Sequence, residues 1–167
     1  MKGWIKAIII LPFNALVVIP CLILYFSGYA LRFNTPPLVA AGGVLGVAGL
    51  TLAGWTMCLF DKVGKGTAAP WEPPRKLVVR GPYRHVRNPM ITSVLVMLLA
   101  EYLILDAPAV LIWLGVFFAV NTVYFPLFEE RDLEKRFGEA YLEYRRNVPR
   151  WIPRLTGWRP ESRADMG

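Results

Sequence analysis

Four long apolar stretches alternate with polar segments along most of the chain. They run from Ile8 to Ala30, from Leu38 to Phe60, from Met90 to Leu105 and from Ala107 to Phe128, and Glu101 is the only charged residue within them. A helix needs about 20 mostly apolar residues to cross a lipid bilayer. The pattern therefore predicts an all-α fold, an integral membrane bundle of four transmembrane helices.

Two of these stretches contain residues that shape a helix. Gly42 and Gly46 have the GxxxG spacing, which lets another helix approach the backbone closely. Pro126 removes a backbone hydrogen bond near the end of the fourth stretch, so it predicts a kink there. Such a kink turns the following residues inward.

The segment after the fourth stretch has the period of an amphipathic helix from Glu129 to about Arg146. Its apolar stripe consists of Leu133, Phe137, Ala140, Tyr141 and Tyr144. Glu129 stands one turn before this stripe, and Glu130 lies about 100° round the helix. A carboxylate at a membrane boundary is costly unless it meets a cation or hydrogen-bond donors. The alternative is that both acids only complement the helix dipole.

The polar segment Asp61–Asn88 contains several prolines and glycines, which exclude a long regular helix. An irregular loop of this length is usually functional in a compact protein. Its candidate basic side chains are Arg75, Lys76, Arg80, Arg84 and Arg87, together with His85. They either contact anionic lipid headgroups or together form a site.

The distribution of charge predicts an orientation. A mean hydropathy of +0.41 argues against a soluble globule. Of the 19 Lys and Arg residues, only Arg32 lies between the first two stretches, and none lies between the third and fourth. Short loops rich in Lys and Arg stay in the cytoplasm, so we expect a multi-pass protein with both termini and the Asp61–Asn88 loop cytoplasmic. An anionic membrane surface accounts for the net charge of +7, so nucleic acid is not an expected partner.

Two motifs together resemble a known family. The segment LVVRGPYRHVRNPM is followed, after an apolar hairpin, by EERDLEKRFGEAYLEYRRNVPRWIP. This arrangement is similar to the superfamily of isoprenylcysteine carboxyl methyltransferases and phospholipid methyltransferases, which are integral membrane enzymes, and it covers residues 67–153. The resemblance implies S-adenosylmethionine as the cofactor, held between the loop and the helix after the paired glutamates. We expect one domain over 1–167, with an N-terminal helix pair (1–60), a cofactor-binding catalytic core (61–154) and a tail (155–167).

The resemblance also implies which residues bind the cofactor. These are Arg75, Lys76, Leu77, Val78, Tyr83, Asn88, Pro89, Met90, Ile91, Glu129 and Glu130, of which Glu129 binds the amino group. The family commonly has His-Pro-x-Tyr where this chain has Asn88 to Ile91, so a histidine and a tyrosine are replaced.

The acceptor side shows a further departure. The carboxyl methyltransferases of the family place a substrate-binding arginine where this chain has Phe125. We assign Phe125 and Arg87 to the substrate and prefer a neutral or amine acceptor slightly over a carboxylate. An amine must lose a proton before methylation, so His85, the only histidine, is the expected base. Asn88 is the second expected catalytic residue, and the alternative for His85 is contact with lipid headgroups.

The sequence therefore predicts methyl transfer from S-adenosylmethionine to a lipophilic acceptor in the membrane. This acceptor is a phospholipid amine, a prenylcysteine carboxylate or another small apolar nucleophile, and the transfer needs no metal. The alternatives are an NADPH-dependent reductase of the sterol type and a membrane scaffold without activity. We expect membrane lipids as partners and no obligate protein partner. The paired glutamates favour a cationic cofactor over a polyanionic dinucleotide.

Overall fold

The structure, a computed structural model, describes residues 9–64 and 74–160. Within these ranges the chain forms helices and no strand, as the sequence predicts. In chain order they are η1 (Ile9–Val18), α2 (Ile19–Phe26), α3 (Pro36–Leu59), η2 (Phe60–Gly64), η3 (Gly81–Arg84), α4 (Pro89–Leu105), α5 (Pro108–Tyr124), η4 (Phe125–Glu129), α6 (Glu130–Phe137) and α7 (Glu139–Asn147). Part of the predicted loop, part of the predicted tail and the first residues of the chain lie outside the described residues.

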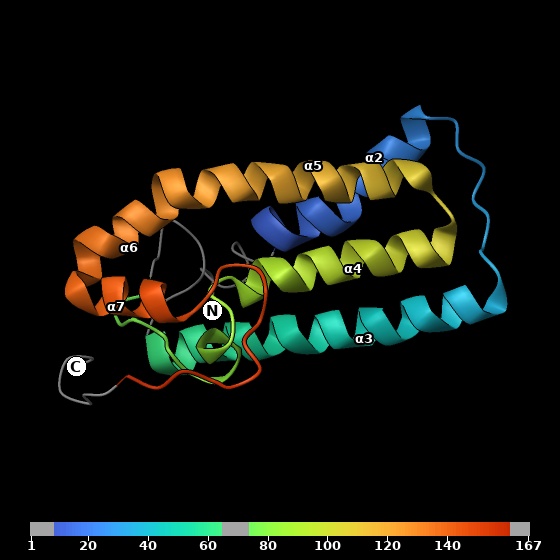
Figure 1. The fold of residues 1–167 in the computed structure, drawn as a ribbon. Helices are drawn as coiled ribbons and strands as arrows, with labels where there is room; N and C mark the ends of the chain where they lie inside the picture. The colour runs from blue at the N-terminus through green and yellow to red at the C-terminus, as the bar shows by residue number, and fades with distance from the viewer. Residues whose placement is uncertain (1–8, 65–73, 161–167) are drawn as a thin grey trace.

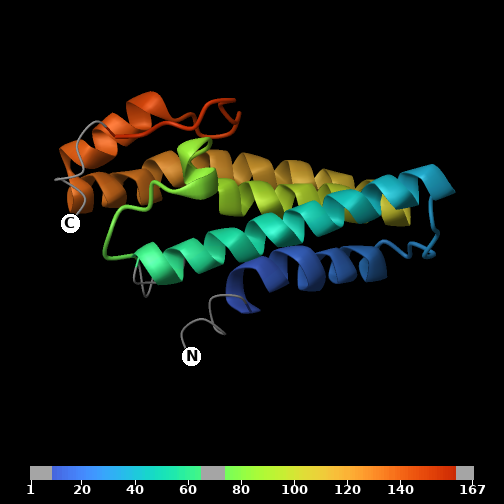
Figure 2. The same cartoon turned by 90° about the horizontal axis from the view of Figure 1, so that it is seen from below.

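The long helices form a bundle in which α4 lies between α3 and α5 (Figures 1 and 2). The pair η1 and α2 packs against α4 and α5. The end of α3, the start of α4 and the helices α6 and α7 all lie at one end of the bundle, and the connections from α2 to α3 and from α4 to α5 lie at the other (Figure 1). The Lys- and Arg-rich segments that the structure describes are thus gathered at a single end.

Within residues 9–64 and 74–160, two helical stretches are long and apolar enough to cross a membrane, Pro36–Gly64 and Pro108–Phe137. In the most apolar 18-residue part of each stretch, only 17% and 11%, respectively, is buried inside the protein. They therefore differ from the core helices of a soluble protein, which are covered by protein on most sides, and their apolar faces need another apolar environment. Pro12–Phe26 and Pro89–Leu105 are apolar but shorter. The count of four membrane crossings stays a prediction.

Glycines allow α3 to lie directly against α4. A Cβ added at Gly42 would come within 2.9 Å of the Ala100 carbonyl oxygen, and one added at Gly49 would come within 3.1 Å of the Ser93 carbonyl oxygen. Gly46 lies between these positions on the same face, where its added Cβ would meet Ala100 at 3.8 Å. The close approach predicted from the GxxxG spacing is confirmed, and it extends one turn further to Gly49.

The chain turns twice after α5. Pro126 lies within the π-helical turn η4, where the axis changes direction between α5 and α6 (Figure 1), so the predicted kink is confirmed. The prediction of one continuous amphipathic helix to about Arg146 is wrong, because α6 ends at Phe137 and α7 begins at Glu139. Gly138 separates them at φ +56° and ψ −131°, a conformation that side chains with a Cβ rarely adopt.

A small second core lies at this end of the bundle. Its buried residues are Val79, Tyr141, Tyr144 and Val148, and Leu77, Leu133, Phe137 and Trp158 pack against them. These residues come from segment 74–87, from α6 and α7, and from segment 148–160, which together are called the end cap below. The bundle has a separate core around Val94, Met97, Leu98 and Val110.

Candidate functional site

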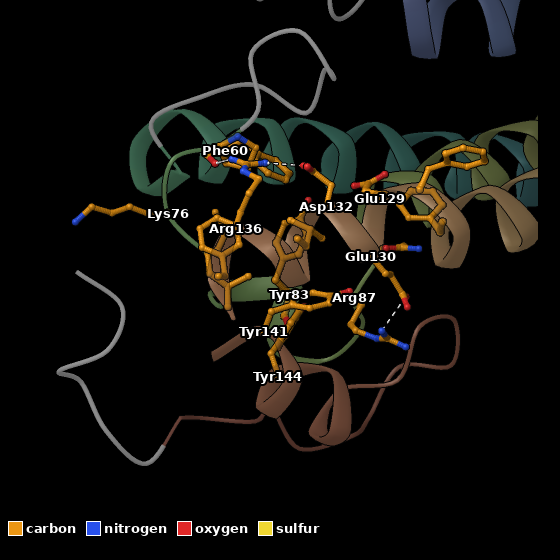
Figure 3. Close-up of a pocket in the computed structure, with 18 of the residues that line it drawn as sticks. Phe60, Lys76, Tyr83, Arg87, Glu129, Glu130, Asp132, Arg136, Tyr141 and Tyr144 are labelled. Atoms are coloured by element: carbon orange, nitrogen blue, oxygen red, sulfur yellow. Dashed lines mark hydrogen bonds and ion pairs between the residues drawn. The ribbon is translucent and has the colours of Figure 1, made fainter. Parts of the chain in front are cut away.

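A cavity of about 360 Å³ lies where the end cap meets the bundle (Figure 3). It is lined by Phe60, Pro74, Lys76, Leu77, Val78, Tyr83, Arg87, Asn88, Tyr124, Phe125, Phe128, Glu129, Glu130, Asp132, Leu133, Arg136, Phe137, Tyr141 and Tyr144. Most of these residues belong to the loop before α4 and to the helices after Pro126, whereas Phe60 comes from η2, Tyr124 from the end of α5 and Phe125 from the start of η4. After the kink at η4, α6 contributes one side of the cavity and the loop contributes another.

The two adjacent glutamates have opposite surroundings. Glu130 is only 5% exposed, and its carboxylate accepts hydrogen bonds from Arg87 Nη1 (2.8 Å), Arg150 Nε (2.9 Å) and Arg150 Nη2 (3.0 Å). Glu129 is exposed to the cavity and has no hydrogen bond or ion pair with any residue that the structure describes. One carboxylate is neutralised by the protein, and the other is available to a cationic ligand.

The remaining charges of the cavity are mostly paired. Asp132 accepts a hydrogen bond from Arg136 at 3.3 Å, and the same guanidinium donates to the Pro74 carbonyl oxygen and lies 5.2 Å from the centre of the Phe137 ring. Lys76 extends away from the acidic side chains (Figure 3). Among the described lining residues, Glu129 is therefore the acid that lacks a protein cation.

Tyrosines form one wall of the cavity. Tyr83 is buried, packs edge-on against Phe60 at 5.4 Å between ring centres, and accepts a hydrogen bond on its carbonyl oxygen from the Tyr144 hydroxyl at 2.7 Å. Burial raises the pKa of Tyr83 and of Tyr144 well above the usual value for tyrosine, and it raises the pKa of Tyr141 to about 12. All three side chains are therefore neutral phenols at physiological pH.

Most of the residues predicted to bind a cofactor line this cavity. Lys76, Leu77, Val78, Tyr83, Asn88, Glu129 and Glu130 do so, together with the predicted substrate residues Arg87 and Phe125. Met90 and Ile91 line only an adjoining cavity, which is described below. Arg75 and Pro89 are among the lining residues of neither cavity. Arg75 is exposed, and its backbone N–H donates to the Gly64 carbonyl oxygen at 2.8 Å.

His85 is also absent from the walls of both cavities. Its Nδ1 is 2.8 Å from the Arg154 carbonyl oxygen, which requires the ring proton on Nδ1, and its own carbonyl oxygen accepts from the Arg154 N–H at 2.9 Å. A Cβ added at Gly157 would lie 3.0 Å from Nε2, so the C-terminal segment covers the other ring nitrogen. The catalytic role of His85 stays a prediction, and the observed role is to attach segment 148–160 to the loop.

Sequence reasoning missed several site residues. Arg150 neutralises Glu130 from twenty residues further along the chain, and no local pattern indicates that pairing. Asp132 and Arg136 line the cavity as an i, i+4 pair. Their spacing could have predicted the ion pair, although not its place in the cavity wall. Tyr141 and Tyr144 were predicted as a buried stripe, and the burial is confirmed at 2% and 3% exposure. Their position in the cavity wall was not predicted.

Fold and site together describe a membrane protein with apolar helices and a cavity lined by charged residues at one end. Comparison with known families identifies its class, because the sequence model of the phospholipid methyltransferase family matches residues 37–140. The chain belongs to this family. The matched region contains α3, α4, α5, the loop before α4, and Glu129 with Glu130.

A curated relative supports the same class. The chain is 38% identical over 76 residues to methanethiol S-methyltransferase 2 of Bradyrhizobium diazoefficiens. The matched segment covers 44% of this chain and only 27% of the relative. No solved structure matches. The family and the relative give no support to the alternatives of a sterol-type reductase or a scaffold.

Proposed function

We propose that the protein transfers a methyl group from S-adenosylmethionine to a lipophilic acceptor, and that the cavity at the end cap binds the cofactor. The observation that carries the proposal is the contrast between Glu129 and Glu130. A carboxylate without a protein partner, on the wall of a cavity whose other acids are paired, is suited to an ammonium group.

The residues present fit the other parts of this cofactor. Its carboxylate needs a basic or polar donor, which Lys76 supplies. Its adenine needs flat or apolar walls, which Phe60, Tyr83 and Leu77 supply. The cavity volume of about 360 Å³ is typical of a small-molecule site. A dinucleotide such as NADPH is suited less well, because Arg87 and Arg136 already pair with acids and Glu129 repels phosphate.

When bound, S-adenosylmethionine supplies an electrophilic methyl group on a positively charged sulfur. The residues of this chain would hold the cofactor and exclude water. Glu129 orients the amino group, and the neutral tyrosines and Phe60 keep bulk water from the reacting region. Alignment and desolvation of two bound reactants provide much of the rate in such displacements.

The proposal also includes the orientation of the protein in the membrane. The described Lys- and Arg-rich segments lie at the same end of the bundle as the cavity (Figure 1), which supports a multi-pass protein whose site faces the cytoplasm. The acceptor would reach the site from the lipid, with membrane lipids as its surroundings. Residues 90–105 and 12–26 would then complete four crossings.

Ligand-dependent stabilisation tests this function. The protein in nanodiscs should unfold at a higher temperature with S-adenosylmethionine, because a ligand that binds only the folded state stabilises it by mass action. NADPH at the same concentration should have no comparable effect. Labelled methyl from the cofactor should then appear in a lipophilic acceptor.

The controls separate the alternatives. Stabilisation by NADPH and not by S-adenosylmethionine would establish a reductase-type cofactor and overturn the proposal. The absence of stabilisation by either ligand, together with no transfer of label to any acceptor, would favour a scaffold.

A further inference from the structure

Segment 148–160 runs from the end cap back to the bundle. After α7 it passes beside the start of α4 (Figures 1 and 2). The Trp151 ring packs against Phe118 of α5 and Phe125 of η4, with 5.1 Å and 6.4 Å between the ring centres. Both phenylalanines belong to the apolar stretch Pro108–Phe137. The segment therefore contacts a helical stretch that is apolar enough to cross a membrane.

Two apolar side chains of this segment have almost no protein around them. Ile152 is 79% exposed and Leu155 is 100% exposed. The backbone beside them is nevertheless held in place, because the N–H groups of Arg154 and Trp158 each donate, at 2.9 Å, to a carbonyl oxygen of the segment before α4. An exposed apolar pair that is fixed next to a lipid-facing helix indicates an interaction surface.

Three arginines near this pair have no acidic partner among the residues that the structure describes. Arg84 and Arg154 donate only to backbone carbonyl oxygens, those of residues 157, 158 and 147. Such bonds orient a guanidinium group and do not neutralise its charge. Arg159 is exposed and has no ion pair within the described ranges. The surface therefore combines exposed apolar side chains with positive charges that need anions from outside the chain.

This combination fits an anionic phospholipid surface. Apolar side chains enter the acyl region, arginine side chains reach the phosphate groups, and tryptophan is enriched at the boundary between the two. A symmetric contact between two copies of the chain suits the surface less well. Such a contact brings the same patch of both copies together, so the three unpaired positive charges of each copy would repel those of the other.

We propose that residues 151–159, called the anchor segment below, bind anionic phospholipids at the membrane surface. Ile152 and Leu155 insert among the acyl chains. Arg154 and Arg159, together with Arg84 from the segment before α4, contact the headgroup phosphates. The apolar pair accepts lipid of any charge, and the arginines select negatively charged headgroups.

The anchor segment is joined to the ligand cavities on its other side. Arg150 directly precedes it and donates to the Glu130 carboxylate at 2.9 Å and 3.0 Å. Trp151 packs against Phe125, which lines both the first cavity and the adjoining one, a cavity of about 230 Å³ between η1, α4 and α5. Lipid bound at Ile152 and Leu155 thus keeps the neighbouring residues 150 and 151 in place. Anionic lipid should therefore tighten binding of S-adenosylmethionine, and this consequence alone rests on the proposed function.

Hydrogen exchange tests the effect of lipid charge. The protein is placed, one copy each, in nanodiscs of phosphatidylcholine or of phosphatidylcholine mixed with phosphatidylglycerol. The amides of Arg154 and Trp158 report on the segment, because their hydrogen bonds attach it to the loop. One basic residue at an anionic surface contributes about a fivefold change in equilibrium. Exchange of these amides should therefore slow at least fivefold with phosphatidylglycerol, whereas amides of α4 should not respond.

A fluorophore tests insertion. Leu155→Cys, in protein that also carries Cys21→Ser and Cys58→Ser, is labelled with an environment-sensitive dye. Lipids with a nitroxide on the acyl chain should quench this dye. Glu139→Cys in the same background is the control, because Glu139 is exposed at the start of α7, away from the bundle (Figure 1). Its dye should stay accessible to a quencher in water.

Variants separate the two parts of the surface. Ile152→Gln combined with Leu155→Gln should speed exchange of the Trp158 amide about tenfold in the mixed nanodiscs, because the acyl contact is lost. The fold should persist, since both side chains are exposed. Thr156→Gln, an exposed neighbour, should have no effect.

A second pair of variants tests the charge. Arg159→Gln should reduce the difference between the two lipid compositions about fivefold. Arg146→Gln is its control, because Arg146 is exposed and already pairs with Glu139 at 3.5 Å. This control should reduce the difference less than twofold.

The contrary results are distinct. A dye at position 155 that stays in water in both kinds of nanodisc would refute the anchor segment. Equal exchange in the two compositions would contradict the assignment to anionic lipid. Shielding of position 155 only in nanodiscs that hold two copies would assign the surface to a contact between copies. Protection by phosphatidylglycerol without any binding of S-adenosylmethionine would contradict the proposed function and leave the anchor segment established.

Discussion

The helix bundle and the end cap are held together by different contacts. In the bundle, α3 meets α4 along Gly42, Gly46 and Gly49, and the core is aliphatic. In the end cap, the buried carboxylate of Glu130 joins Arg87 and Arg150, which belong to separate segments. Glycine contacts depend on shape alone, whereas each polar group of the end cap depends on its partners. The cavity lies at the border of these two regions, so its geometry requires both.

Removal of the Glu130 carboxylate should have the largest effect on the end cap. Glu130→Ala leaves two partly buried guanidinium groups without a counter-charge, which costs about 3–5 kcal/mol. Amides of α7 and of segment 148–158 should lose protection in hydrogen exchange, while those of α3 keep it. Glu134→Ala is the matched control, because its half-exposed pair with Arg145 at 3.4 Å contributes about 0.2–1 kcal/mol. Similar losses in both variants would contradict the role assigned to Glu130.

The stability of the bundle should depend on side-chain size at the contact between α3 and α4, and not on charge. Gly42→Ala places a methyl group 2.9 Å from the Ala100 carbonyl oxygen, so α3 and α4 must separate at a cost of about 1–3 kcal/mol. Gly43→Ala meets nothing within 4 Å and should be neutral or slightly stabilising. Resistance to denaturation in detergent would measure both. A neutral Gly42→Ala would show that the helices are not in tight contact there.

His85→Ala should have a smaller effect. The variant loses the contact between Nδ1 and the Arg154 carbonyl oxygen, which contributes about 0.5–1.5 kcal/mol to attachment of segment 148–160. Since His85 lines neither cavity, turnover should fall less than tenfold. Initial rates at saturating cofactor decide between the two roles. A fall of about 10²-fold would establish the catalytic base that the sequence predicts.

The sequence predicts the bundle better than the end cap for a physical reason. Helices, the glycine contact and the kink at Pro126 follow from local periodicity and from single residues, so the sequence anticipates them. The break at Gly138 was missed because the apolar stripe continues across it, from Phe137 to Tyr141. A glycine within a periodic segment is compatible with either a continuous or a broken helix.

The candidate site likewise has features that follow from the local sequence and features that depend on long-range contacts. The sequence indicates Glu129 as a candidate site residue, because it follows the predicted kink and stands one turn before the apolar stripe. The pairing of Glu130 with Arg87 and Arg150, and of His85 with Arg154, connects residues that are far apart in the chain, so spacing carries no signal of them. These long-range pairs decide which acid is free. Within the described residues the structure leaves Glu129 unpaired, and this is the acid that the family resemblance assigns to the amino group of the cofactor.

Affinity for S-adenosylmethionine tests the central claim most directly. Dissociation constants are measured by calorimetry for the wild type, for Glu129→Gln, and for Glu134→Gln as the control on the same helical segment. Loss of a charge-assisted bond to an ammonium costs about 1.5–3 kcal/mol, so Glu129→Gln should bind about 10- to 150-fold more weakly, with the unliganded protein as stable as the wild type. Glu134→Gln should bind as the wild type does. Equal affinity of all three proteins would contradict the assignment of the unpaired carboxylate to the cofactor.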